Sequence, residues 1–366
     1  MVGYIMFKIS PILFILFAIF PFYTKPGQVV NISQLKKLAS IKKRIKTTTK
    51  TPLIQHNISL KDKNWLKTGG PAHYFAAPTT AQDFQKALAF AKKHELPIFI
   101  LGEGATVLIS DEGFPGLVIH PQLKAITHKS LNNKEAIVTA GAGLSVGELT
   151  DYCLNHNITG LEDFSAIPSS IGGALHNNLY YFEAQIHQLV DSLVIIEKET
   201  GAIKTVKADW LMKDGKPQLH EKKHFVLQVS FRLKRCTPLE TAYTRGRRDE
   251  ITRQRVKRFP MSLSSGFFFK QLNENEAPVI IKGRKMTNPM FYLDQLNIKG
   301  TLQNDGAIVC HQHANMINNK GSATTADIIN LARTIQAMAL EKFGILLQPD
   351  CKLVGFENSP FLQKQS

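Results

Sequence analysis

The sequence has 366 residues, of which 43% are apolar and only 20% are charged. This composition excludes an intrinsically disordered chain and suits a globular protein of two or three domains. Lysine and arginine outnumber the acidic residues by 45 to 29, giving a formal charge of +16. That charge fits nucleic acid, anionic lipid or an anionic small substrate, and does not by itself choose among them.

The first 23 residues carry the only targeting signal. Residues 11–23 are all apolar, which is short of the ~20 residues of a spanning helix, but residues 5–23 reach that length if Lys8 is tolerated. Eight basic residues follow between positions 25 and 50, so the positive-inside rule predicts a single-pass anchor with the remaining chain in the cytoplasm. Two alternatives stay open: a start codon assigned too early, and a cleaved signal peptide, which is the weaker interpretation because no A-x-A cleavage site follows the apolar segment.

From about residue 52 the pattern is that of a mixed α and β enzyme. Apolar residues recur with helical spacing over residues 81–94 and 323–343. Short apolar runs of strand length lie between them, at residues 98–101, 116–119, 193–196 and 226–231.

Three glycine-containing segments mark places where the backbone approaches a neighbour or a ligand closely. They read TGGPA at 68–72, LGEGATVLISD at 101–111 and IPSSIGGA at 167–174. Backbone amides in such turns can bind a phosphate, although a glycine in a turn more often serves the turn itself. Three of them in one half of the chain favour a nucleotide cofactor.

Other candidate sites have simpler interpretations. The four cysteines are widely spaced without a CxxC pair, which favours reduced, packed thiols and no disulfide. His311 and His313 have no acidic partner nearby, so no metal site is predicted. Seven basic residues between 245 and 258 could bind nucleic acid, but acidic residues interrupt them and no aromatics are interleaved. A solvated helix near a pyrophosphate site is the preferred interpretation, and no nucleic-acid partner is expected.

The glycine segments, taken in order with their neighbours, resemble UDP-N-acetylenolpyruvoylglucosamine reductases. The N-terminal match adds EGF at 112–114 and GLE at 160–162. The C-terminal match consists of LDQ at 293–295, KG at 299–300, GAIV at 306–309, HAN at 313–315, Asn319, FG at 343–344 and LQPD at 347–350. The resemblance extends from about residue 53 to residue 356.

This resemblance implies an α+β fold: a two-lobed FAD-binding domain of the vanillyl-alcohol oxidase (PCMH) type, followed by a C-terminal α+β substrate-binding domain. The predicted boundaries are a hydrophobic segment at 1–23, a basic linker at 24–52, the FAD domain at 53–240, the substrate domain at 241–358 and a tail at 359–366. It also implies FAD as the cofactor, NADPH as the reductant and a UDP-sugar as the partner, in cell-wall precursor synthesis. The oligomeric state is not predicted.

The resemblance also assigns binding residues. For the substrate they are Lys270, His313 and Asn315. For FAD they are Gly69, Gly70, Gly102, Gly104, Ala105, Thr106, Ser110, Asp111, Pro168, Ser169, Ser170, Gly172, Gly173 and Asn178. Two family glycines after the third segment are replaced by Tyr180 and Glu183, and Glu103 replaces a glycine beside the pyrophosphate position.

The catalytic positions depart further from the family. The family's proton-donating serine aligns on Phe267, and its glutamate aligns on Asp350, which is one methylene shorter. The family's arginine aligns within residues 211–224, where the chain has neither Tyr nor Arg; Lys213 or Lys216 could stand near it. Reduction of an enolpyruvyl group needs a proton donor and electrostatic stabilisation beside the carboxylate. We therefore expect an inactive or strongly impaired homologue, with an active reductase of rearranged site as the alternative.

Overall fold

The computed structural model describes residues 52–181, 183–213, 216, 217, 219, 223–260 and 263–363. The predicted anchor at 5–23 and most of the basic linker lie outside these residues. Within the described ranges, no helix is both long enough and apolar enough to cross a bilayer.

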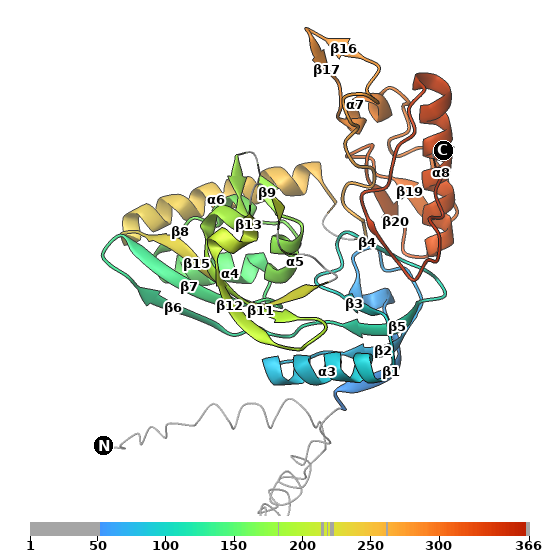
Figure 1. The fold of residues 1–366 in the computed structure, drawn as a ribbon. Helices are drawn as coiled ribbons and strands as arrows, with labels where there is room; N and C mark the ends of the chain where they lie inside the picture. The colour runs from blue at the N-terminus through green and yellow to red at the C-terminus, as the bar shows by residue number, and fades with distance from the viewer. Residues whose placement is uncertain are drawn as a thin grey trace, which may run out of the picture. The chain divides into compact units, whose positions relative to one another are not determined.

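The first lobe is a four-stranded sheet in the order β1-β2-β5-β3. Its strands are β1 (Ile54–Ser59), β2 (Pro71–Ala76), β3 (Ile98–Ile100) and β5 (Phe114–Ile119). Both β2 and β3 pair with β5 in parallel, and β1 is antiparallel to β2. Helix α3 (Ala81–Lys93) buries Phe84 and Leu88 against this lobe, as the helical spacing of residues 81–94 predicted (Figure 1).

The second lobe is an antiparallel sheet in the order β12-β11-β15-β7-β6, with β8 beside β15. Its longest strand, β15 (His224–Arg235), extends beyond the predicted run at 226–231. The other strands are β6 (Ile126–Ser130), β7 (Glu135–Gly141), β8 (Ile158–Thr159), β11 (Val190–Glu197) and β12 (Ile203–Lys207). Helices α4 (Val146–Asn155) and α5 (Ile171–His176) pack buried side chains into the core of this lobe.

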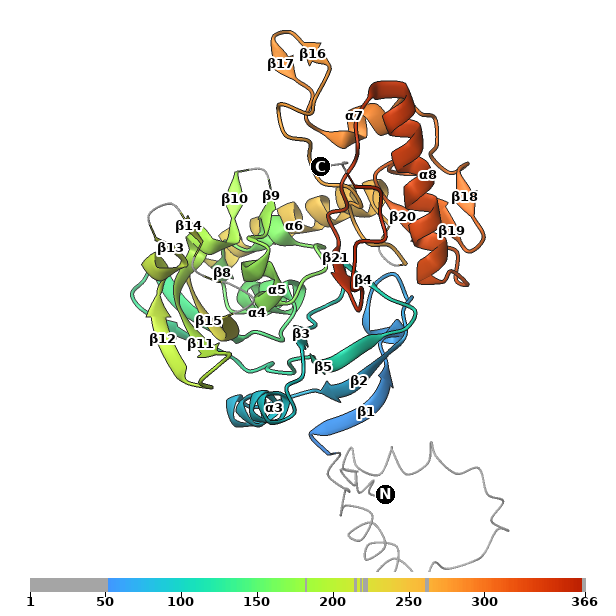
Figure 2. The ribbon, with the colours of Figure 1, turned by 45° about the vertical axis from the view of Figure 1, so that its right-hand side comes forward.

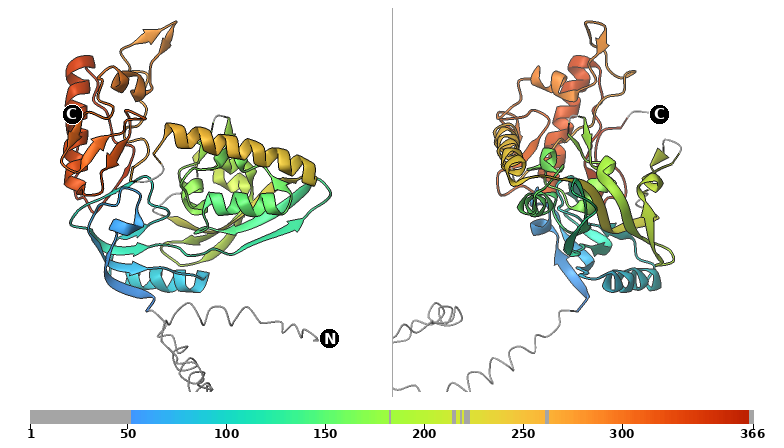
Figure 3. Two further views of the ribbon diagram at one scale, coloured as in Figure 1. Left: turned by 180° about the vertical axis from the view of Figure 1, so that it is seen from behind. Right: turned by 90° about the vertical axis from the view of Figure 1, so that its left-hand side faces the viewer.

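The 21-residue helix α6 (Pro238–Arg258) follows β15 and is bound to the second lobe by ion pairs. Arg247 contacts Asp163 at 2.7 Å and Arg248 contacts Asp151 at 2.6 Å. The helix begins with a capping box between Thr237 and Glu240, which satisfies its first free amides. The seven basic residues therefore lie on one helix, and two of them are paired with carboxylates of α4 and of the segment after β8. Figure 3 shows α6 as the long gold helix.

The C-terminal part packs helices α7 (Pro289–Asp294) and α8 (Thr325–Phe343) against a small sheet of β18 (Gln303–Asn304), β19 (Ala307–Val309) and β20 (Ile317–Asn319). A hairpin of β16 (Ile280–Ile281) and β17 (Arg284–Lys285) precedes α7. The last strand, β21 (Lys352–Val354), pairs in parallel with β4 (Val107–Ile109) of the first lobe (Figure 2). This pairing brings the segment around Asp350 to the loop that ends at Thr106, where Lys352 N donates to Thr106 O at 2.9 Å.

Candidate functional site

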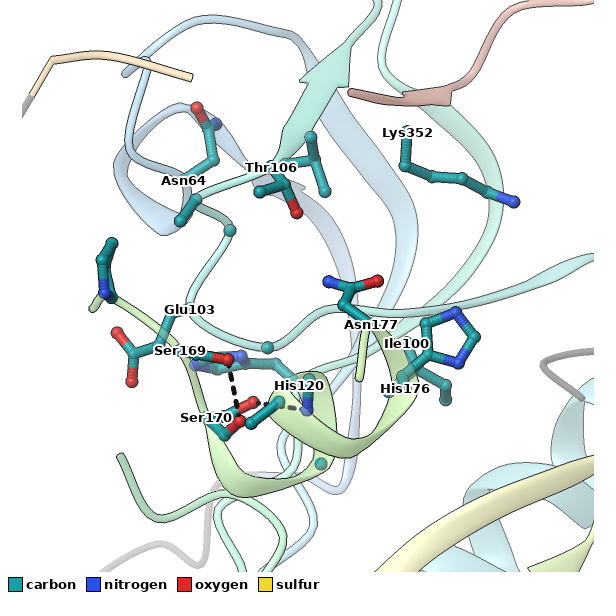
Figure 4. A pocket seen from close by; sticks show the side chains of 18 of the residues that line it. Asn64, Ile100, Glu103, Thr106, His120, Ser169, Ser170, His176, Asn177 and Lys352 are labelled. Carbon is teal, nitrogen blue, oxygen red and sulfur yellow. Dashed lines mark hydrogen bonds between the residues drawn. The ribbon is translucent and has the colours of Figure 1, made fainter. Parts of the chain in front are cut away.

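One cavity of about 1300 Å³ collects most of the predicted site residues. Its wall includes the loop between β3 and β4, the turn before α5, the start of β21 and the aromatic ring of Phe267. The residues of the FAD prediction that line it are Gly102, Gly104, Ala105, Thr106, Pro168, Ser169, Ser170, Gly172 and Gly173. Figure 4 shows the side chains of Thr106, Asn177, Ser169 and Ser170 around this space.

The loop after β3 presents free backbone amides to the cavity. None of the amides of Gly102, Glu103 and Gly104 donates a hydrogen bond to another described residue, whereas Gly104 O accepts from Trp65 N at 3.0 Å. Gly104 has φ +69°, and a Cβ there would lie 2.6 Å from Lys63 O, so both its conformation and its packing require glycine. Unused amides in such a turn suit the oxygens of a phosphate group.

The turn before α5 contributes shape rather than free amides. Ser170 Oγ accepts from Gly173 N at 3.2 Å, and Gly172 N donates to Ala142 O at 2.9 Å. A Cβ on Gly102 would lie 2.5 Å from Ser170 Oγ, so this turn interlocks with the loop after β3. Gly102 is thus needed for the close packing of its loop on this turn, whose Ser169 and Ser170 both line the cavity.

Five residues of the FAD prediction lie away from the cavity wall and have structural contacts instead. A Cβ on Gly70 would lie 2.1 Å from Asp111 O, and one on Gly69 would lie 2.7 Å from Ile109 Cβ. The Asp111 carboxylate accepts from Thr325 N and Ala326 N at the start of α8, each at 2.9 Å. The remaining two are Ser110, whose Oγ accepts from Glu112 N, and Asn178, whose Oδ1 bonds His187 Nδ1.

The two aligned catalytic positions, Phe267 and Asp350, both line the cavity. Of the three consecutive phenylalanines, Phe268 and Phe269 are buried core residues, whereas Phe267 keeps 49% of its surface exposed. Its ring stacks on His313 with centroids 4.8 Å apart and lies edge-on to Phe259 at 5.7 Å. At the position predicted to correspond to the family's serine, this chain therefore presents an aromatic face.

None of the three predicted substrate residues is on the cavity wall. Asn315 bonds both the N–H and the C=O of Phe269, at 2.9 and 2.8 Å, and so fixes the strand that carries Phe267. Lys270 is exposed and its backbone N–H donates to Gln348 O. His313 contributes its ring to the stack described above.

Burial lowers the pKa of His313 to about 4. The imidazole is therefore neutral at neutral pH, and because Asn315 N donates to its Nδ1 at 3.2 Å, the remaining proton lies on Nε2. His120, which unlike His313 is on the cavity wall, also has its pKa lowered by burial, and its Nδ1 donates to Leu101 O at 2.9 Å. Neither histidine carries a charge that could neutralise a bound anion at pH 7.

The positive charge of the cavity comes instead from lysine and arginine. Six such side chains and three carboxylates line it: Lys63, Lys67, Lys124, Lys198, Arg255 and Lys352 against Asp62, Glu103 and Asp350. An excess of cations over a concave surface attracts and holds an anionic ligand. The carboxylate of Glu103, in the loop after β3, reduces this excess locally.

Arg255 is the site residue that sequence reasoning missed. Its guanidinium lies over the ring of Tyr181, 4.2 Å from the centroid, and its Nε is buried without a hydrogen-bond partner among the described residues. Burial also lowers the pKa of Arg255 from its usual value. In the sequence Arg255 stands among other arginines that are typical of a solvent-exposed helix, so no local pattern distinguishes it. In the fold it is the one basic residue of α6 that lies on the cavity wall.

The described residues contain no group of three or more metal-ligating side chains. The four cysteines are free thiols, and burial raises the pKa of Cys153 and of Cys351 to about 12 each, which leaves both unreactive.

Comparison with known proteins identifies the family. A profile of the FAD binding domain matches residues 72–207, and a profile of the UDP-N-acetylenolpyruvoylglucosamine reductase C-terminal domain matches residues 259–354. The UDP-N-acetylenolpyruvoylglucosamine reductase of Listeria monocytogenes is 30% identical over 304 residues, covering 82% of this chain and 95% of the relative. The chain belongs to the UDP-N-acetylenolpyruvoylglucosamine reductase family.

Two further relatives agree with this assignment. The Clostridium novyi reductase is 27% identical over 319 residues, covering 87% of this chain and 97% of the relative. The crystal structure of the Thermus caldophilus reductase covers 82% of this chain and 98% of its own, with a TM-score of 0.63 at 23% identity, which shows a shared fold. The predicted fold, a FAD-binding domain with a C-terminal α+β domain, is confirmed.

Proposed function

We propose that this chain binds FAD and a UDP-sugar in the cavity and reduces an enolpyruvyl UDP-sugar slowly or not at all. The observation that carries this proposal is the exposed ring of Phe267 on the cavity wall, with Asp350 on the same wall. The names of the relatives supply the candidate substrate, and the match of a FAD binding domain supplies the cofactor. NADPH is the proposed reductant, and the positive-inside prediction for residues 25–50 favours a cytoplasmic location.

The residues present fit FAD. The free amides of residues 102–104 would hold its phosphates, and Thr106, Ser169 and Gly173 would lie along it. FAD, when bound, supplies the hydride transfer. Of the two residues in place of family glycines, Tyr180 is on the cavity wall with 64% of its surface exposed, and Glu183 is exposed away from the wall. We propose that the other five residues of the FAD prediction stabilise the structure around the cavity and do not contact FAD: Gly69, Gly70, Ser110, Asp111 and Asn178.

Arg255 provides the site for an anionic group of the UDP-sugar. A guanidinium with an unpaired Nε, stacked on Tyr181, is preorganised for an oxyanion because its side chain loses little freedom on binding. The Nε–H of Arg255 donates to no described residue. The excess of cations on the cavity wall also favours an anionic ligand.

The chemistry of reduction is where the chain is deficient. Hydride addition to the enolpyruvyl double bond leaves negative charge beside the carboxylate, and a proton must reach the neighbouring carbon. Phe267 has no exchangeable proton, and its ring covers His313 on one face. Asp350 retains a carboxylate, but its shorter side chain withdraws it from the position that a glutamate would reach. Losing a general acid alone costs roughly 100- to 10,000-fold in rate.

A second candidate is a working reductase with a rearranged site. Two observations favour it: Arg255 is a cation available to the substrate carboxylate, and His313 carries an Nε2–H next to the ring of Phe267. In this case Arg255 would replace the family's missing arginine. The neutral imidazole of His313 is a weak acid, so this route would be fastest at low pH, where the imidazolium is populated.

Purified full-length protein separates the two candidates. Flavin is detected by its absorbance, and UDP-sugar binding by calorimetry with the enolpyruvyl UDP-sugar. Substrate-dependent NADPH oxidation is then measured beside the Listeria monocytogenes reductase. The first candidate is supported if the protein binds flavin and UDP-sugar but oxidises NADPH at least about 1,000-fold more slowly than that reductase. Comparable rates of NADPH oxidation support the second candidate. Failure to bind either ligand contradicts both.

A further inference from the structure

The hairpin of β16 and β17 is the most exposed apolar feature of the C-terminal part. Ile280 pairs with Lys285 and Ile281 with Arg284, joined by a two-residue turn of Lys282 and Gly283 with φ +50° and +75°. Positive φ at both turn residues is the geometry that keeps a tight hairpin twisted and closed. The hairpin projects away from α7 in every view (Figures 1 and 3).

The tip combines apolar and basic side chains without neighbours to cover them. Ile280 and Ile281 are 60% and 42% exposed, and Lys282, Arg284 and Lys285 are exposed beside them. Among the described residues, none of these three cations forms an ion pair; Lys285 Nζ donates to the backbone oxygen of Glu274 at 2.7 Å. The carboxylate of Glu276, which precedes the hairpin in the sequence, accepts hydrogen bonds from the backbone N–H and the side-chain amide of Asn273.

We propose that this hairpin tip docks on an anionic lipid bilayer, with the two isoleucines entering the interfacial region. Adjacent apolar and cationic side chains match a bilayer surface, where acyl chains lie directly beneath negatively charged headgroups. A convex two-residue apolar tip suits insertion into lipid better than docking on a rigid protein surface, which would need a matching pocket. The chain's formal charge of +16 favours the same surface.

This proposal does not depend on the reductase activity, and it is tested on the full-length chain. The probe is a tryptophan at the tip, I281W, mixed with vesicles of phosphatidylglycerol and phosphatidylcholine carrying brominated acyl chains, which quench only inserted indoles. The matched control is Y243W, at a residue 86% exposed on the basic helix α6. Emission of the parent protein, which has two tryptophans, is subtracted. A third variant adds K282Q, R284Q and K285Q to I281W, and unchanged melting temperatures verify that all variants fold.

We expect I281W emission to shift to the blue and lose intensity on the anionic vesicles, and to do neither on phosphatidylcholine alone. This loss of emission intensity should be absent in the variant with three glutamines. It should become smaller as the salt concentration rises toward about 0.5 M, because surface charges are then screened. Y243W shows no quenching. The proposal is overturned if I281W is quenched no more than the parent protein, or if Y243W is quenched as strongly as I281W. It is also overturned if I281W is quenched equally on neutral vesicles, or if the variant without the three charges is still quenched.

Discussion

The ring of Phe267 stacks on the imidazole of His313, with centroids 4.8 Å apart and an interplanar angle of 29°. Phe259 completes the group, 5.6 Å from His313. Aromatic contacts of this kind add about 0.5–1.5 kcal/mol beyond simple burial. Phe267, at the predicted proton-donor position, is therefore part of an aromatic cluster, and a change at 267 affects packing as well as chemistry.

The first prediction concerns F267S. A hydroxyl at 267 should not by itself restore turnover, because residues 211–224, where the family's arginine is predicted to align, contain no arginine, and Asp350 is one methylene shorter than a glutamate. We expect NADPH oxidation with the enolpyruvyl UDP-sugar to rise by less than about tenfold over the parent. F267A, which opens the same space without a hydroxyl, is the control. A gain of about 100-fold or more in F267S but not F267A would show that the missing proton donor is the only serious defect.

The second prediction tests Arg255 as the anion site. R255A should weaken binding of the UDP-sugar by roughly 10- to 100-fold, the usual loss for a charged hydrogen bond, whereas R255K should lose less because it keeps the charge. The matched control is R253A, on the same helix, whose guanidinium is exposed and paired with Glu250. Calorimetric titration gives both values. Equal weakening by R253A and R255A would mean that general charge, and not this residue, sets the affinity.

The third prediction concerns the interlocked loops. G102A should lower both stability and FAD affinity, because the new Cβ would lie 2.5 Å from Ser170 Oγ. The second change S170A removes that oxygen and should recover part of the FAD affinity, although it costs about 1 kcal/mol as a lost helix cap. In contrast, G147A has nothing within 4 Å of the new methyl group and should be neutral or stabilising by up to about 1 kcal/mol. Full FAD affinity in G102A would contradict the close packing of the two loops.

The fourth prediction separates Asp111 from the cofactor. D111A removes two acceptors at the start of α8 and should reduce the free energy of unfolding by about 1–2 kcal/mol. The dissociation constant of FAD should be unchanged, because the carboxylate serves the helix. Urea unfolding and flavin fluorescence titration measure the two quantities. If FAD binding weakens on the order of tenfold while stability is retained, Asp111 belongs to the cofactor site after all.

The fifth prediction follows from the low pKa of His313. Its pKa is about 4 in the folded chain and near 6.5 when unfolded. Below pH 6.5 the unfolded chain binds the proton and the folded chain does not, so the free energy of unfolding falls as the pH falls toward 4. Between pH 7.5 and 4.5 the parent should lose about 1–2 kcal/mol more than H313Q, allowing for partial solvent exposure of the ring. Parallel losses in the two proteins would contradict the assigned burial effect.

The apolar runs and the helical spacing predict individual strands and helices of a mixed α and β chain, such as β15 and α3. The two-lobed FAD domain and the C-terminal domain, by contrast, are predicted from the family resemblance and not from these local patterns. The loop at 102–106 and the turn at 168–173 do line one cavity, and Phe267 and Asp350 line it as well. Other placements depend on tertiary contacts that no local pattern encodes. Asp111 serves a helix more than 200 residues later in the chain, and the role of Arg255 depends on which face of α6 turns toward Tyr181.

We infer that the cavity binds FAD and the UDP-sugar but lacks the groups that complete the reduction. Anaerobic stopped-flow measurement tests it most directly: the flavin is reduced with NADPH and mixed with the enolpyruvyl UDP-sugar, and its reoxidation is followed at its visible absorbance. We predict a bound flavin whose reoxidation is at least about 1,000-fold slower than that of the Listeria monocytogenes reductase measured alongside. Reoxidation at a rate comparable to that enzyme would contradict the account.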